Sequence, residues 1–64
     1  MYKRIRELRE DRDLTQGEVA NFLHVSQATY SRYENGKLDI PSLCLIKLAK
    51  FYGKSVDYLL GLTD

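Results

Sequence analysis

Apolar residues recur along this chain at intervals of three or four positions, and no stretch shows the strict alternation that is typical of a half-buried strand. This spacing predicts five short helices, at about residues 2–12, 16–23, 27–35, 42–52 and 56–60. The residues expected to point into a shared core are Ile5, Leu8, Val19, Ala20, Leu23, Tyr30, Tyr33, Leu43, Ile46, Ala49, Tyr52, Val56, Leu59 and Leu60. The pattern therefore predicts an all-α fold, a compact five-helix bundle in a single domain that covers residues 1–64.

Residues that favour helix ends stand at the predicted boundaries. Thr15 and Glu18 fit a capping box, in which each side chain bonds the backbone N–H of the other residue. Ser26 and Ser55 are favourable N-cap residues for the third and fifth helices. Glycine readily adopts a left-handed conformation, and it follows the last three helices at Gly36, Gly53 and Gly61.

The second and third helices are joined by only three or four residues. So short a turn does not allow antiparallel packing side by side and favours a steep crossing, at roughly 90–120°. Ala20 stands where the two helices must approach closely, because a larger side chain would hold them apart. Residues 16–35 are therefore expected to form a helix-turn-helix around a small core of Val19, Leu23, Val25, Tyr30 and Tyr33.

This packing leaves polar or very short side chains on the outer face of the third helix, namely Gln27, Ala28, Ser31 and Arg32. A helix with such a face fits the major groove of DNA, which is about 12 Å wide. Glutamine can bond adenine through two hydrogen bonds, arginine can bond guanine in the same way, and alanine can contact the thymine methyl group. We therefore expect these four residues to contact bases. Without the turn geometry, the better interpretation of Gln27 and Arg32 would be ordinary solvated helix residues.

Composition excludes several classes of protein. Cys44 is the only cysteine, so the chain can form no internal disulfide and no cysteine-rich metal site, and we expect no metal and no cofactor. The sequence holds no catalytic triad pattern and no glycine-rich phosphate loop, so an enzyme is not expected. No apolar run approaches the roughly 20 residues that span a bilayer, and we expect a cytoplasmic protein without membrane contact. The net charge of +1 argues neither for nor against nucleic acid as a partner.

The order of these residues resembles the Cro/phage-repressor family of helix-turn-helix proteins, also called the xenobiotic-response-element type. The resemblance covers essentially the whole chain. It is carried in the first half by Leu14-Thr15-Gln16, Val19-Ala20, Leu23, Val25-Ser26-Gln27, Tyr33-Glu34-Asn35-Gly36-Lys37 and Pro41. It continues through Leu43, Ile46-Lys47, Ala49-Lys50, Gly53 and Val56-Asp57-Tyr58-Leu59-Leu60-Gly61.

The resemblance implies that the third helix reads DNA, with base-contacting positions at Gln27, Ala28 and Arg32. It also implies contacts to the DNA backbone at the start of the second helix and around the ends of the third. With Ser26 added from its place at the start of the third helix, the expected phosphate contacts are Gln16, Ser26, Asn35 and Lys37.

Other implications of the resemblance concern structure and assembly. Arg9 and Glu34 match a partly buried ion pair that ties the first helix to the end of the third. Dimerisation through the fifth helix and the loop before the fourth would here use Ile40, Val56 and Tyr58. The family places glycine in the turn where this chain has His24, and histidine can adopt the left-handed conformation at some strain.

Two functions remain open at this point. In the first, the chain is a sequence-specific transcriptional regulator, a repressor that binds a palindromic operator in double-stranded DNA as a homodimer. In the second, it is an antitoxin or another protein-interaction module that uses the same fold. The affinity of a DNA reader should fall steeply as salt rises, whereas a protein-binding module should show little affinity for DNA near physiological salt.

Overall fold

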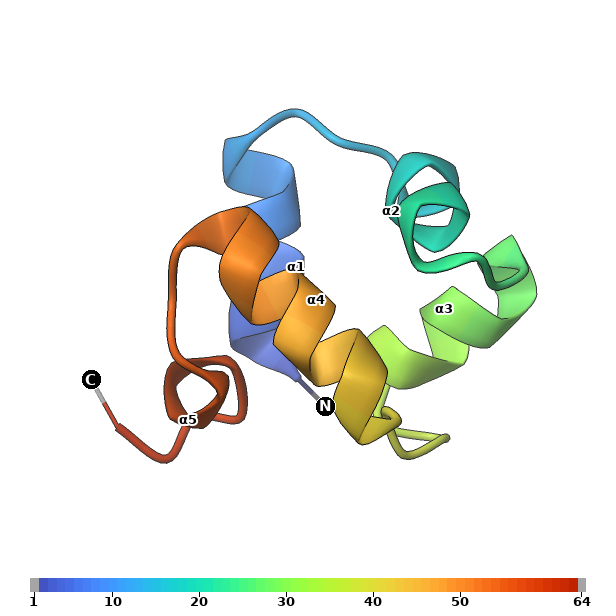
Figure 1. The fold of residues 1–64 in the computed structure, drawn as a ribbon. Coiled ribbons are helices and arrows are strands. Elements are labelled where there is room, and N and C mark those ends of the chain that lie inside the picture. The colour runs from blue at the N-terminus through green and yellow to red at the C-terminus, as the bar shows by residue number, and fades with distance from the viewer. Residues whose placement is uncertain (1, 64) are drawn as a thin grey trace.

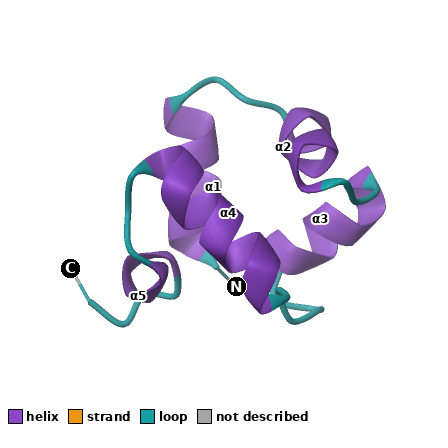
Figure 2. Ribbon diagram, in the orientation of Figure 1, coloured by secondary structure: helices purple, strands orange, loops and turns teal. Residues whose placement is uncertain are grey.

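A computed structural model describes residues 2–63, and every regular element among them is a helix (Figures 1 and 2). The helices are α1 (Lys3–Asp11), α2 (Gln16–Leu23), α3 (Gln27–Glu34), α4 (Ser42–Tyr52) and α5 (Val56–Leu59). The all-α fold class is confirmed, and so are the five elements.

One apolar core is shared by all five helices. Ile5 of α1, Tyr30 of α3, Leu48 of α4 and Leu59 of α5 are at most 1% exposed, and Val19, Ala20 and Leu23 of α2 are at most 4% exposed. The loop between α3 and α4 adds Ile40 to the same cluster. Because no helix has a core of its own, the position of α3 depends on packing that involves the whole chain.

The predicted inward face of α4 is wrong in part. Leu43 and Ile46 are 74% and 45% exposed, whereas Leu48 and Tyr52 are buried and Cys44, Leu45 and Ala49 pack partly against the core. The predicted positions follow one another at intervals of three residues. Three residues fall short of a full helical turn by about 60°, so these positions move progressively around the helix instead of staying on one face. Residues 45, 48, 49 and 52 stay within one stripe of the helix surface, and this is the stripe that the core covers.

Each of the five helices ends in the same way, with one residue in the left-handed conformation. A backbone hydrogen bond of 2.9–3.1 Å then joins the next N–H to the carbonyl five residues earlier, as in a Schellman motif. The left-handed residues are Asp13, His24, Gly36, Gly53 and Gly61. The three glycines were predicted from the sequence as residues that end helices. The left-handed conformation of His24 was predicted through the family resemblance, and that of Asp13 was not predicted.

Candidate nucleic-acid interface

The turn between α2 and α3 is built on His24, whose backbone angles are φ 60° and ψ 40°. The N–H of Val25 donates to the carbonyl of Ala20 at 3.0 Å, which turns the chain sharply out of α2. Ala20 is 2% exposed. In Figure 1, α2 is seen almost end-on while α3 runs across the view, so the two axes cross steeply, as predicted.

The start of each helix in this pair is fixed by a side-chain cap. The Glu18 N–H donates to Thr15 Oγ1 at 3.1 Å and the Thr15 N–H donates to Glu18 Oε1 at 3.0 Å, which completes the predicted capping box of α2. The Thr29 N–H donates to Ser26 Oγ at 3.1 Å and so caps α3. Both helices therefore begin at defined residues.

The inner side of α3 is closed off by its own molecule. Tyr30, Tyr33 and Glu34 are at most 5% exposed. On the other side, Gln27, Ala28 and Arg32 are exposed, and Ser31 is half-buried. Within residues 2–63, the Arg32 guanidinium forms neither a hydrogen bond nor an ion pair. A row of short or polar side chains thus lies uncovered along one face of a helix that is otherwise anchored in the core.

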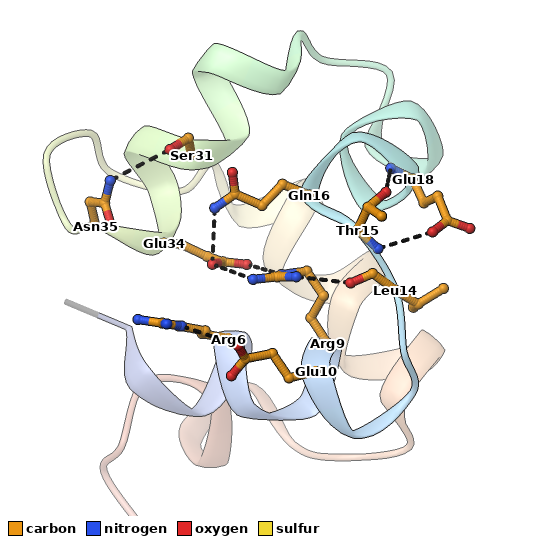
Figure 3. Close-up of polar contacts among 10 residues, drawn as sticks. All are labelled: Arg6, Arg9, Glu10, Leu14, Thr15, Gln16, Glu18, Ser31, Glu34 and Asn35. Carbon is orange, nitrogen blue, oxygen red and sulfur yellow. Dashed lines mark hydrogen bonds and ion pairs between the residues drawn. The ribbon is translucent and has the colours of Figure 1, made fainter.

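A buried carboxylate lies behind this face. Glu34 is 2% exposed and accepts hydrogen bonds from Arg9 Nε at 2.7 Å and Arg9 Nη2 at 3.3 Å. The Arg9 Nη1 group donates to the carbonyl of Leu14 at 2.8 Å. This is the ion pair that the family resemblance implies, and it joins α1, the loop before α2 and the last turn of α3 (Figure 3).

Gln16 belongs to the same network, which the sequence did not indicate. Its Nε2 donates to Glu34 Oε1 at 3.3 Å (Figure 3). An amide nitrogen carries two N–H groups, so the bond to Glu34 orients the side chain and leaves a second donor. The group expected to contact phosphate is therefore held by the same carboxylate that holds Arg9.

The protonation states of this cluster follow from its contacts. Burial alone would raise the pKa of Glu34, but hydrogen bonds from neighbours including Arg9 and Gln16, with the positive charge of Arg9, lower it below its ordinary value. The hydrogen bond to Glu34 raises the pKa of Arg9. Burial, with a smaller effect of the Glu34 charge, raises the pKa of Tyr52 to about 12. At neutral pH the pair is thus fully ionised and both neighbouring tyrosines, Tyr30 and Tyr52, keep their protons.

The family model that matches the sequence covers residues 5–59, which is most of the chain, and describes a helix-turn-helix. The chain belongs to the Cro/phage-repressor type of helix-turn-helix family. This family membership is shared with proteins that are named as transcriptional regulators.

Similar curated proteins are regulators of the same family. The chain is 39% identical over 62 residues to an uncharacterized HTH-type transcriptional regulator, YobD, of Bacillus subtilis, covering 97% of this chain and 55% of that protein. It is 46% identical over 58 residues to the cryptic phage CTXphi transcriptional repressor RstR of Vibrio cholerae, covering 91% of this chain and 52% of the repressor. It is 39% identical over 59 residues to the B. subtilis regulator ImmR, covering 92% of this chain and 46% of that protein. The chain thus spans about half the length of these relatives.

In this helix-turn-helix chain, the four residues expected to contact phosphate have different surroundings. Ser26 uses its hydroxyl inside the fold, since Oγ accepts from the Thr29 N–H and donates to Thr29 Oγ1 at 2.9 Å. Asn35 and Lys37 are exposed just past α3, and Asn35 Nδ2 donates to Ser31 Oγ at 3.5 Å (Figure 3). Gln16 is half-buried and donates to Glu34. Lys37 is therefore the expected phosphate contact with the least competition from its own chain.

The three residues expected at a dimer interface also differ. Ile40 is 8% exposed and packs in the core of its own chain. Val56 and Tyr58 are half-buried. The Tyr58 ring lies 4.4 Å from the Arg4 guanidinium carbon and 5.1 Å from Lys54 Nζ. These side chains offer a second copy only part of their surface, while the exposed Leu43 lies three residues beyond Ile40.

No cluster of His, Cys, Asp or Glu in residues 2–63 is arranged to hold a metal ion, and Cys44 is a half-buried free thiol. None of the helices described is both long enough and apolar enough to cross a membrane.

Proposed function

We propose that the chain reads double-stranded DNA in a sequence-specific way and represses transcription from a palindromic operator as a homodimer. The observation that carries this proposal is the uncovered face of α3, where Gln27, Ala28 and Arg32 are exposed while the opposite side of the same helix is buried. With its side chains an α-helix is about 10–12 Å across, so α3 suits a major groove that is about 12 Å wide. A cytoplasmic location, where operator DNA is found, is part of the same proposal.

The extent of the described residues supports the dimer. Residues 2–63 extend 28 Å along their longest axis. Successive major grooves on one side of DNA lie about 34–36 Å apart, so a single copy with one such helix reaches only one of them. Two copies related by a two-fold axis would place one α3 in each groove, and their preferred site would then be a palindrome.

The experiment that tests the function is selection of bound sequences from a random DNA pool by the purified protein. We expect a palindrome with half-sites about one helical turn apart and an affinity that falls steeply with salt. Recovery of no preferred sequence, together with little affinity for DNA near 0.15 M salt, would favour the protein-interaction module instead.

Two substitutions then separate base reading from phosphate binding. Arg32→Ala should relax the preference at one base pair of each half-site by about 1–3 kcal/mol. Lys37→Ala should weaken binding to all sequences alike and make the salt slope shallower by about 0.9 for each Lys37 that neutralises a phosphate. Both effects are measured in gel-shift titrations, at fixed salt for Arg32→Ala and over a series of salt concentrations for Lys37→Ala. Unchanged affinity in both variants would mean that another face docks on the DNA.

A further inference from the structure

Gly17 is the second residue of α2, and its own backbone does not require glycine. The glycines with positive φ in the described chain are Gly36, Gly53 and Gly61, and Gly17 is not one of them. Within a helix, glycine is less favourable than alanine because it loses more conformational freedom when the chain folds. What distinguishes glycine from alanine at this position is therefore the space around it.

That space is occupied by the end of the Gln27 side chain. A Cβ atom on residue 17 would lie 3.3 Å from Gln27 Oε1 and 3.8 Å from Gln27 Cδ. The first distance is tighter than nine in ten contacts that real Cβ atoms make, so the Gln27 amide would have to move by a few tenths of an ångström. The amide of Gln27 thus lies against the first turn of α2, in room that only a glycine leaves free.

We infer that Gly17 is a positioning residue for base recognition, because it allows the Gln27 amide to lie against α2 and so sets the direction from which this amide approaches a base. The inference rests on the proposed reading of DNA by Gln27. A bidentate contact with adenine needs both amide atoms at hydrogen-bonding distance, so a displacement of a few tenths of an ångström at Oε1 weakens it. The fold tolerates the same displacement, since the atom that moves is the free end of a flexible side chain.

The test compares Gly17→Ala with Asn21→Ala, a substitution at an exposed position of the same helix. Both replace a poorer helix former with alanine, but only the first adds an atom beside Gln27. We expect neither variant to have a lower thermal midpoint than the wild type. At the base pair that Gln27 reads, Gly17→Ala should reduce discrimination by at least about fivefold, the low end of what one bidentate contact supplies, and Asn21→Ala should leave it unchanged.

A second comparison tests whether Gly17→Ala acts through Gln27. In a Gln27→Ala background, Gly17→Ala should cause no further loss of discrimination. Wild-type discrimination in Gly17→Ala, or an equal loss in the Gln27→Ala background, would overturn the inference. The side-chain amide resonances of Gln27 in the free protein give a reading without DNA, and they should shift in Gly17→Ala but not in Asn21→Ala. If the wild type selected no sequence, the proposed function would fail on its own, and unshifted amide resonances would separately refute the placement of Gln27 by Gly17.

Discussion

At the scale of single residues, Glu34 is the group on which most of the interactions behind the exposed face of α3 converge. It accepts from two Arg9 nitrogens and from Gln16, and through Arg9 it reaches the Leu14 carbonyl. A buried carboxylate without such partners would be strongly unfavourable. With them, it holds α1, the loop before α2 and α3 in one arrangement, and it orients a side chain expected to contact DNA.

Glu34→Gln should therefore destabilise the chain far more than a chemically identical change on the surface. It leaves the Arg9 side chain, which is 12% exposed, without its counter-charge, and breaking a buried pair in this way costs about 3–5 kcal/mol. The matched control is Glu10→Gln, which removes an exposed pair with Arg6 at 3.6 Å that contributes about 0.3–0.5 kcal/mol. Urea denaturation gives both values. Similar losses in the two variants would contradict the central role of Glu34.

The same carboxylate sets part of the pH dependence of stability. Its pKa is below the ordinary value of 4.5 in the folded chain, so the unfolded chain binds its proton first as pH falls. The stabilisation from Glu34 is fully present above about pH 4.5 and is lost as pH falls below that value through the folded pKa. Urea titrations from pH 6 to pH 3 give the free energy of unfolding as a function of pH. This free energy should fall less steeply with decreasing pH in Glu34→Gln than in Glu10→Gln. Equally steep decreases would show that other carboxylates control acid unfolding.

At the scale of the elements, local signals predicted the helices well because they act over a few residues. The capping box at Thr15 and Glu18, the Ser26 cap and the glycine stops involve neighbours in sequence, and the structure contains all of them. The face of α4 was harder to predict because its apolar residues outnumber those that one core can cover. Likewise, the bond between Gln16 and Glu34 spans 18 residues and arises only when α2 and α3 pack.

The turn between α2 and α3 gives a test at this scale. His24 holds a left-handed conformation that is unfavourable by roughly 1–2 kcal/mol for a residue with a Cβ atom. His24→Gly should therefore raise the free energy of unfolding by about 0.5–1 kcal/mol, after allowance for the greater freedom of glycine in the unfolded chain. His24→Val should lower it, because a branched side chain is disfavoured most strongly there. A destabilised His24→Gly variant would show that the histidine side chain contributes contacts that outweigh the strain.

At the scale of the whole molecule, the proposed dimer requires an apolar surface that the folded chain leaves uncovered. Ile40 cannot supply it, since it is 8% exposed, but Leu43 is 74% exposed and Ile46, one turn further along α4, is 45% exposed. These two residues extend the predicted interface from the loop onto α4. Burying one such leucine contributes about 1.5–3 kcal/mol, enough to decide whether a small dimer persists at micromolar concentrations.

Leu43→Asp should consequently convert the proposed dimer to a monomer without unfolding the chain, because the Leu43 side chain contributes little to the core. Leu62→Asp is the matched control, since Leu62 is 73% exposed but lies beyond the end of α5. Sedimentation equilibrium should show a monomer for the first variant and a dimer for the second. Only the first should lose affinity for the palindrome, and its affinity for an isolated half-site should equal that of the wild type. If Leu43→Asp remained a dimer, the interface would lie elsewhere. If Leu62→Asp alone dissociated, contacts around Leu62 rather than α4 would join the two copies. Those contacts would then determine the distance between the two α3 helices.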